Sequence, residues 1–447
     1  MIYCINYKRS NQTFSVETSL STLFFREETM KKLLIAVLCL MLTGCAAPAP
    51  SDGSGPDRSV SPDIPAPSPA ASSAPNGESG PPQASPETDP ETAENPSASQ
   101  EPSESSLGPQ NQEQTIQELL SAMTLEEKVG QMFFVRCPET GGAELAAQYK
   151  VGGYLLFGRD FKDKTAQQVR DDIQSYQDAS GIPLLIGTDE EGGTVVRASS
   201  NPDLFPQREP APQTLFAQGG MDLILQDARQ KSMTLLDLGV NVNFAPVADV
   251  STDPADFIYA RSFGQDAQAT ANYVAQVVGV MGEEQIGSVL KHFPGYGNNV
   301  DTHTGIALDQ RPYETFQTSD FLPFQAGIQA GADAVLVSHN IAASMDESLP
   351  ASLSPTVHKI LREELGFDGV VLTDDLAMDA VMEYAQNGSA AVLAIQAGND
   401  MVVTTDFQTQ IPQVIHAVQS GVIAESQIDQ AVTRVLNWKY ELGLLGN

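Results

Sequence analysis

Two short segments of this sequence carry side chains suited to acid–base and nucleophilic chemistry. The first, residues 291–305, reads KHFPGYGNNVDTHTG and places Asp301 two residues before His303. A carboxylate this close to an imidazole can fix its tautomer and raise its pKa by favouring the cation. Such a histidine can donate a proton to a leaving oxygen and later accept one from water. The spacing predicts a general acid/base, although a surface Asp/His loop or a metal site that includes His292 would fit the same residues.

The second segment, residues 361–375, reads LREELGFDGVVLTDD. It predicts an amphipathic helix that ends at Gly366 and an apolar strand that runs directly into Asp374 and Asp375. Side chains of adjacent strand residues point to opposite faces of a sheet. Only one of the two aspartates is therefore expected to point into a site, and the two should not form a catalytic dyad.

The elements that must position these segments alternate between short apolar runs and helical patterns from Thr115 onward. Continuous runs rich in Val, Ile, Leu or Phe are typical of parallel strands covered on both faces. Eight such strands over roughly 330 residues predict a single (β/α)8 barrel of the TIM type, an α/β fold. A doubly wound open sheet would show a similar alternation, but no GxGxxG motif follows the first strand. The expected strands are 131–135, 153–157, 183–188, 242–245, 288–291, 334–338, 370–373 and 401–404, and the expected helices include 165–179, 223–238, 267–284 and 354–365.

Polar side chains are expected at the carboxyl ends of several of these strands, where barrels of this type gather their functional groups. Asp189 follows the third strand, Lys291 and His292 end the fifth, His339 ends the sixth and Asp374 follows the seventh. An unpaired charge is costly to bury beside an apolar run. Their convergence on one rim therefore predicts a polar pocket, although any one of them could instead cap a helix or face solvent.

At these residues the chain resembles glycoside hydrolase family 3, and within it the NagZ-type β-N-acetylglucosaminidases. The signature around the family's nucleophile resembles residues 361–366 followed by 369–374, which implies that Asp374 is the nucleophile. The KHFPGHG…DSH motif is matched by residues 291–297 and 301–303. This match implies that His303 is the acid/base and that Asp301 is its partner.

Two further motifs extend the resemblance, which covers roughly residues 116–445. The DQEGG motif resembles residues 189–193 and the RSFG motif matches residues 261–264. The substrate-binding residues implied or expected on this basis are Asp189, Arg261, Lys291, His292 and His339. The chain departs from the family pattern at Tyr296, where a histidine is usual, and at Thr194, where an arginine is common. The loop before Asp301 also looks one residue shorter, and these departures bear on substrate preference more than on the reaction.

The resemblance implies a retaining β-N-acetylhexosaminidase that needs no cofactor and no metal. It would release terminal β-linked N-acetylglucosamine from murein or chitin-type oligosaccharides through a covalent glycosyl-aspartate intermediate. A β-glucosidase or β-xylosidase of the same family would share the barrel, but those enzymes commonly take the acid/base from a second domain, and none is expected here after the last barrel helix. A glycoside phosphorylase and a non-catalytic, lipid-anchored sugar-binding protein are also compatible with these motifs.

The chain before residue 114 predicts export and a tether. Residues 1–29 lack any periodic pattern, so we expect translation to start at Met30. Residues 30–45, MKKLLIAVLCLMLTGC, have the basic start, apolar run and small-residue exit of a signal peptide, and the run is too short for a permanent membrane span. The Leu-x-Gly-Cys ending resembles the lipobox of bacterial lipoproteins. It implies a lipid on Cys45 and an extracytoplasmic protein anchored to the cell membrane, whereas ordinary signal cleavage would leave no anchor.

Residues 46–113 consist almost entirely of Pro, Ser, Ala, Glu, Gly, Asp and Gln, which predicts a disordered linker to a catalytic barrel at 114–447. The net charge of -33, from 24 Lys and Arg against 57 Asp and Glu, disfavours nucleic acid as a partner. The four cysteines form no CxxC pair, so neither a zinc site nor a disulfide framework is expected. Cys137, the only cysteine in the globular part, is expected to be a buried, inert thiol.

Overall fold

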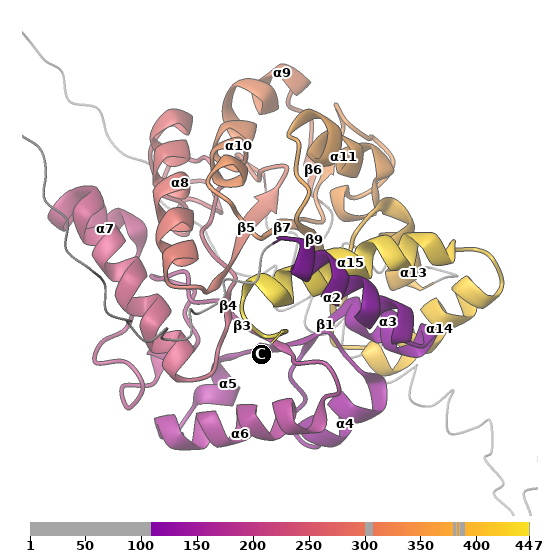
Figure 1. The fold of residues 1–447 in the computed structure, drawn as a ribbon. Helices are drawn as coiled ribbons and strands as arrows, with labels where there is room; N and C mark the ends of the chain where they lie inside the picture. The colour runs from indigo at the N-terminus through magenta and orange to yellow at the C-terminus, as the bar shows by residue number, and fades with distance from the viewer. Residues whose placement is uncertain (1–108, 300–306, 379–380, 382–383, 385–388, 447) are drawn as a thin grey trace, which may run out of the picture. The chain divides into compact units, whose positions relative to one another are not determined.

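An eight-stranded parallel sheet forms the centre of the structure (Figure 1). The computed structural model describes residues 109–299, 307–378, 381, 384 and 389–446. The strands follow the order β10-β1-β2-β3-β4-β5-β7-β9. The two end strands of this order also meet, because Leu372 bridges to Met401 and the Thr373 N–H donates to the Met401 carbonyl at 3.3 Å. The sheet thus closes, and the predicted (β/α)8 barrel is confirmed.

Helices follow the strands and surround the barrel (Figure 1). The barrel strands are β1 (Phe133–Arg136), β2 (Gly153–Leu156), β3 (Leu185–Thr188), β4 (Val242–Asn243), β5 (Gly287–Phe293), β7 (Ala334–Val337), β9 (Val370–Thr373) and β10 (Val402–Thr404). A separate two-stranded pair consists of β6 (Leu308–Asp309) and β8 (Ile341–Ala342). The α-helices are α2 (Pro109–Ala122), α3 (Leu125–Gln131), α4 (Gly142–Tyr149), α5 (Gly158–Phe161), α6 (Ala166–Ala179), α7 (Pro212–Asp237), α8 (Ala267–Glu283), α9 (Tyr313–Thr315), α10 (Phe321–Gln329), α11 (Pro355–Lys359), α13 (Ala390–Ala397), α14 (Phe407–Gln419) and α15 (Glu425–Glu441). Short 3-10 and π-helical turns are η1 (Ala198–Ser200), η3 (Phe316–Asp320), η4 (Ala351–Leu353) and η5 (Ile360–Glu364).

All eight predicted strands are present, and the differences lie at the ends of elements. Gln131 is predicted to begin a strand but ends α3, where its side-chain amide donates to the Lys150 carbonyl at 2.9 Å. Helix α2 begins at Pro109, inside the segment predicted to be linker. The side chain of Gln112 donates to Asn437 of α15 at 3.2 Å, so this helix belongs to the barrel domain.

Two of the predicted helices differ from the observed ones. Helix α7 begins at Pro212, well before the predicted start at residue 223, and contains a break at Gly220, whose φ is 67°. Proline suits the first turn of a helix because its φ is already fixed near the helical value. The helix predicted at 354–365 is divided into α11 and the π turn η5.

Alternate residues of the strands fill the inside of the barrel with apolar side chains. Phe134 and Phe244 meet there edge to face, with ring centroids 5.2 Å apart. Gly187 leaves room for them, since a Cβ at this position would lie 2.7 Å from the Phe244 ring and 2.8 Å from the Phe134 ring. Trp438 of α15 packs against Gly287, the first residue of β5. It closes the amino-terminal end of the barrel and leaves the opposite end for a cavity.

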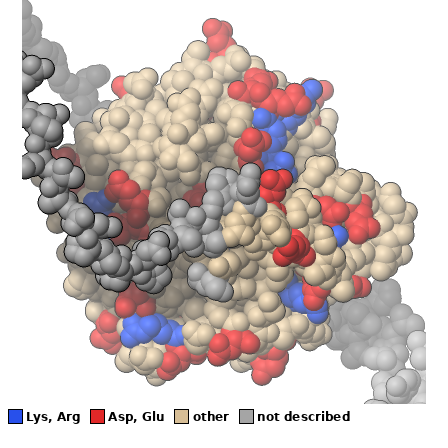
Figure 2. Space-filling model, viewed as in Figure 1, with Lys and Arg blue, Asp and Glu red and all other residues tan. Residues whose placement is uncertain are grey.

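The described surface carries charges of both signs. On the face in Figure 2, acidic side chains are spread around the edge, with smaller groups of basic side chains among them. A phosphate backbone would therefore meet many acidic groups on this face. Among the described residues no helix has the length and apolar character needed to cross a membrane. Cys137 is buried, as expected, and burial raises the pKa of its thiol to about 12.

Lys439 of α15 is a buried cation that titrates far from its usual range. Its Nζ donates to the Gln131 side-chain oxygen at 2.6 Å, and burial lowers its pKa from 10.5 to about 7. The unfolded chain therefore holds this proton over a range in which the folded protein has released it. The contribution of Lys439 to stability should accordingly rise with pH between pH 7 and pH 10.5.

We expect Lys439→Met to remove this dependence. The free energy of unfolding of the wild type, relative to that of the variant, should increase as the pH rises from 7 to 9. The increase should be at most about 1.4 kcal/mol per pH unit. Denaturant unfolding across this range measures the gain. Lys359→Met is the control, because the Lys359 side chain is 68% exposed. A difference between wild type and Lys439→Met that stays constant with pH would contradict a neutral buried lysine.

Candidate active site

The carboxyl ends of the barrel strands surround a cavity of about 340 Å³, within the range of pockets that hold small ligands. The apolar side chains of the barrel interior that reach it are Leu155, Phe244, Leu336 and Val403. The charged and polar residues that line it are Arg136, Asp189, Arg197, Arg261, Lys291, His292, Asp374 and Asp375. Five of the predicted site residues therefore share one cavity: Asp189, Arg261, Lys291, His292 and Asp374.

Alternation along β9 decides which of the two adjacent aspartates continues the inner face of the barrel. Leu372 belongs to the barrel interior, so Asp374, two residues later, lies on the same face. The Asp374 carboxylate accepts a hydrogen bond from the Asp375 N–H at 2.8 Å. The Asp375 carboxylate instead accepts the N–H of Ala377 at 2.9 Å, within the following turn. The two carboxylates thus have different surroundings, although both residues contribute to the lining.

Three strand ends are joined by a buried cluster of ions centred on Glu191. The Lys291 Nζ lies 2.5 Å from Glu191 and 2.8 Å from Asp189. Arg261 donates to both Glu191 oxygens, at 2.8 and 2.9 Å. Burial opposes ionisation of Glu191, but Arg261 and Lys291 together hold its pKa well below the ordinary range. Glu191 is therefore an anion that compensates two cations at the cavity wall.

His292 lies between an acid and a base of this cluster. Its Nδ1 is 2.7 Å from an Asp249 oxygen, and its Nε2 is 3.0 Å from an Arg261 nitrogen. A proton on Nδ1 would be donated to Asp249, and Nε2 would then accept from Arg261, which has only donors. The other Asp249 oxygen accepts the Tyr296 N–H at 2.8 Å. The two contacts thus fix the orientation of the imidazole ring.

His339 does not lie where the sequence predicts. A sugar contact is predicted, but its side chain is completely buried and does not line the cavity. Its Nε2 is 3.0 Å from the Asp375 carbonyl and its Nδ1 is 2.7 Å from the Ser352 hydroxyl. The physical reason is again alternation, because Leu336 points into the barrel and residue 339 falls on the other face. His339 therefore supports the turn that carries Asp374 instead of facing a ligand.

The predicted acid/base His303 and its partner Asp301 lie outside the described residues. The described chain before them ends at residue 299 and includes Tyr296. The Tyr296 ring packs edge-on against the His292 ring at a centroid distance of 5.1 Å. Tyr296 is the residue that stands where a histidine is usual, and it is 1% exposed. The aromatic ring of Tyr296 therefore packs against His292.

A loop after β3 is held in place by Glu190, which points away from the cavity. One Glu190 oxygen accepts the N–H groups of Arg197 and Ala198 at 2.9 and 2.7 Å, and the other accepts the Ser199 hydroxyl. Arg197 then reaches back to Asp189 at 3.3 Å. Glu190 is therefore a positioning residue for the loop that carries Arg197.

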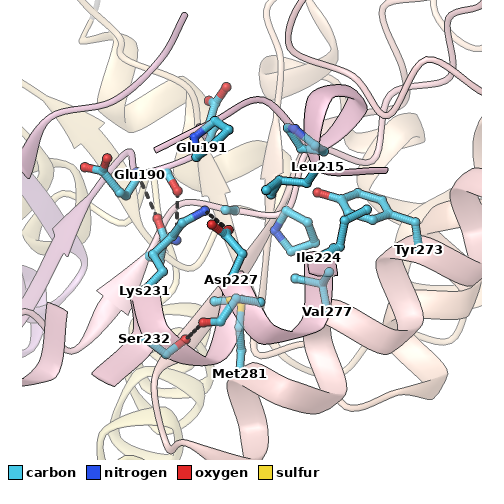
Figure 3. Close-up of a pocket in the computed structure, with 16 residues that line it drawn as sticks. Glu190, Glu191, Leu215, Ile224, Asp227, Lys231, Ser232, Tyr273, Val277 and Met281 are labelled. Carbon is cyan, nitrogen blue, oxygen red and sulfur yellow. Dashed lines mark hydrogen bonds and ion pairs between the residues drawn. The ribbon is translucent and has the colours of Figure 1, made fainter. Parts of the chain in front are cut away.

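Behind this loop is a second cavity, of about 30 Å³ (Figure 3). It has room for about one or two water molecules and none for a sugar. Lys231 points into it, 3.1 Å from Asp227 and 3.5 Å from Glu209. Burial disfavours the charged lysine, but the two carboxylates hold its pKa above the ordinary range. These charges pair with one another, so this cavity supports the site and is not a second substrate pocket.

Five charged residues of the site are missing from the predicted set: Arg136, Glu191, Arg197, Asp249 and Asp375. Asp249 follows the apolar run 244–248 after β4, so the strand-end argument that identifies Asp189 would also have identified it. Glu191 shares a motif with Asp189, but nothing in its spacing indicates that it pairs with Arg261, 70 residues away. Among the described residues no group of three or more His, Cys, Asp or Glu could hold a metal ion.

Comparison with known proteins agrees with this geometry. Residues 124–438 match the family described as "Glycosyl hydrolase family 3 N terminal domain". The chain belongs to glycoside hydrolase family 3. It is 35% identical over 318 residues to a "Beta-hexosaminidase" of Stenotrophomonas maltophilia (strain R551-3), a match that covers 68% of this chain and 89% of the relative.

Solved structures of this family share the barrel. A glycoside hydrolase family 3 beta-N-acetylglucosaminidase from Paenibacillus sp. str. FPU-7 superimposes with a TM-score of 0.66 at 31% identity, covering 73% of this chain and 64% of that one. This chain thus spans just under two thirds of the Paenibacillus protein. A Beta-N-acetylhexosaminidase from Beutenbergia cavernae DSM 12333 superimposes with a TM-score of 0.61 at 29% identity, covering 70% of this chain and 98% of that one.

We expect Glu191→Gln to lower the free energy of unfolding by about 3–5 kcal/mol, because it leaves Arg261 and Lys291 buried without their shared anion. Denaturant unfolding measures the loss. The control is Glu363→Gln, since Glu363 is 67% exposed and lies 3.7 Å from Lys359. That change should stay within about 0.5 kcal/mol of the wild type. Equal effects of the two substitutions would show that the buried cluster does not stabilise the domain.

Proposed function

We propose that this protein is a retaining β-N-acetylhexosaminidase that removes terminal β-linked N-acetylglucosamine from murein or chitin-type oligosaccharides. The observation that carries the proposal is that Asp374 lines one cavity with Asp189, Arg261, Lys291 and His292. The name of the Stenotrophomonas relative and the description of the Paenibacillus structure support N-acetylglucosamine as the sugar. Both identities are at or above 31%.

The paired ions of the cavity suit the hydroxyl groups of a sugar. A hydroxyl both donates and accepts hydrogen bonds, so adjacent hydroxyls can bridge a carboxylate and a cation. Asp189 would accept from one hydroxyl, and Lys291, 2.8 Å from it, would donate to the same or the next one. Arg261 and His292 line the same cavity. Because these charges are already compensated, binding a neutral sugar leaves no ion unpaired.

The first chemical step forms a covalent intermediate. A carboxylate oxygen of Asp374 attacks the anomeric carbon while the bond from that carbon to the leaving oxygen breaks. His303, protonated beside Asp301, gives its proton to the leaving oxygen. The product is a glycosyl ester on Asp374 and a neutral imidazole at His303.

The second step returns the enzyme to its starting state. Neutral His303 takes a proton from water, whose oxygen attacks the anomeric carbon and displaces the Asp374 carboxylate. Two inversions give net retention of configuration. A neutral imidazole does not repel an anionic leaving group, as a second carboxylate would. This would favour murein, in which the leaving sugar is N-acetylmuramic acid.

Two variants separate the proposed roles. Asp374→Asn should lose at least about 10³-fold in kcat on every substrate, because it removes the nucleophile. His303→Ala should lose about 10²–10⁴-fold on a natural disaccharide but much less on an activated aryl N-acetylglucosaminide, whose leaving group needs no proton. Initial rates on 4-methylumbelliferyl N-acetylglucosaminide and on the disaccharide measure both. Wild-type rates from Asp374→Asn would exclude this residue as nucleophile.

We also propose that Cys45 carries a lipid anchor and that the barrel is held outside the cytoplasm on a linker of residues 46–108. The lipobox-like ending of residues 30–45 supports the proposal. Cys45→Ala should move the protein from the membrane fraction to the soluble fraction, since it removes the site of lipidation. Fractionation of cells that express each form is the measurement. Wild-type protein that is wholly soluble would exclude the anchor.

A further inference from the structure

One arginine of the cavity has no carboxylate partner among the described residues, whereas the neighbouring cations do. Arg136 ends β1, and it continues the inner face of that strand because Phe134, two residues earlier, lies inside the barrel. Its side chain lines the same cavity as Asp374. Its Nε atom is buried without a hydrogen-bond partner, and among the described residues it makes no ion pair.

The other cations of the cavity are each paired. Arg197 lies 3.3 Å from Asp189, Lys291 lies 2.8 Å from Asp189, and Arg261 lies 2.8 Å from Glu191. Carboxylates are abundant in this chain, with 57 Asp and Glu against 24 Lys and Arg. A partly buried guanidinium without a partner is costly in such a protein. A purely structural arginine would therefore be expected to have an acidic neighbour.

The side chain of Arg136 is nevertheless held in a defined place. Its guanidinium carbon lies 4.2 Å from the centroid of the Phe157 ring, and that of Arg197 lies 5.2 Å from the same centroid. A cation over an aromatic face is stabilised electrostatically while its N–H groups stay available at the edge. Phe157 thus holds Arg136 in the cavity wall, where no described residue accepts a hydrogen bond from its Nε.

We propose that Arg136 is a specificity-determining residue that binds a carboxylate carried by the sugar next to the cleaved bond. A guanidinium presents parallel N–H donors that match the two oxygens of a carboxylate. A glycan anion would supply the charge that the described protein residues do not supply. This proposal rests on the proposed hexosaminidase function and refines it: the preferred substrates carry an acidic leaving sugar, as in N-acetylglucosaminyl–N-acetylmuramic acid.

The test compares kcat/KM on that acidic disaccharide with kcat/KM on neutral N,N′-diacetylchitobiose. Arg136→Met keeps most of the apolar stem over Phe157 and removes the charge. It should lower the ratio of the two constants by about 10- to 100-fold, the loss expected for one charge-assisted hydrogen bond. The control is Arg159→Met, because Arg159 is a nearby arginine that pairs with Glu139 at 3.1 Å and does not line the cavity. Its ratio should equal that of the wild type.

A chemical change in the substrate tests the same contact without a substitution in the protein. The methyl ester of the acidic disaccharide has no charge. The kcat/KM of the wild type on the ester should therefore fall by the same factor by which Arg136→Met lowers kcat/KM on the acid. Arg136→Met should then show no further loss on the ester. This arm remains decisive if the variant folds poorly.

The outcomes separate this proposal from the function it rests on. Turnover of an aryl N-acetylglucosaminide by the wild type tests the hexosaminidase function alone. If that activity is present and the ratio is unchanged in Arg136→Met, or if the ester is cleaved as fast as the acid by the wild type, the role of Arg136 is overturned. If the aryl substrate is not cleaved at all, the proposed function fails, and this proposal fails with it.

Discussion

Pairing of buried charges is the constraint on which this site depends. Lys291 is 2% exposed and Glu191 is 6% exposed, at the end of a barrel whose interior is otherwise apolar. Burying either ion alone would cost several kcal/mol. The attraction among Glu191, Lys291 and Arg261 offsets part of this desolvation cost. The contacts then run on from Arg261 to His292 and from His292 to Asp249. One connected network therefore ties together the loops that follow β3, β4 and β5.

The barrel supplies the second constraint, because strand alternation sorts the polar residues at the strand ends. Arg136, Asp189, Lys291 and Asp374 each follow an inward-facing residue by two positions and so reach the cavity. His339 is out of step with this pattern and lies beneath the turn of Asp375, where its ring nitrogens contact a backbone carbonyl and a hydroxyl group. The rule does not account for the whole lining, because His292 and Asp375 are out of step with it and still line the cavity.

Much of this architecture could be predicted from the sequence because it depends on local patterns. Each barrel strand is a short apolar run, and a polar residue directly after such a run points to the cavity, as with Asp189 and Asp374. Counting inward positions from Leu336 places residue 339 on the outer face of its strand, which agrees with the burial of His339 away from the cavity. The boundary errors at Gln131 and Pro109 arose because side-chain contacts far along the chain decide them, with Lys150 and α15 respectively.

The pairings within the site could not be predicted in the same way. Glu191 and Arg261 are 70 residues apart, and His292 and Asp249 are 43 apart. When the partner of a charged residue follows a different strand, the sequence around that residue does not identify the partner. That no described residue forms an ion pair with Arg136 is a property of the assembled cavity, and a sequence pattern cannot show it.

In the proposed mechanism Asp374 forms a covalent bond to the sugar. A fluorinated N-acetylglucosamine derivative with a good leaving group would form the glycosyl ester and slow its hydrolysis, so that the intermediate accumulates. Protease digestion and mass spectrometry of the inactivated protein then locate the added sugar. A single labelled carboxylate, Asp374, is expected in the peptide that contains Thr373. A label on Asp375, Asp189 or any other carboxylate would contradict it.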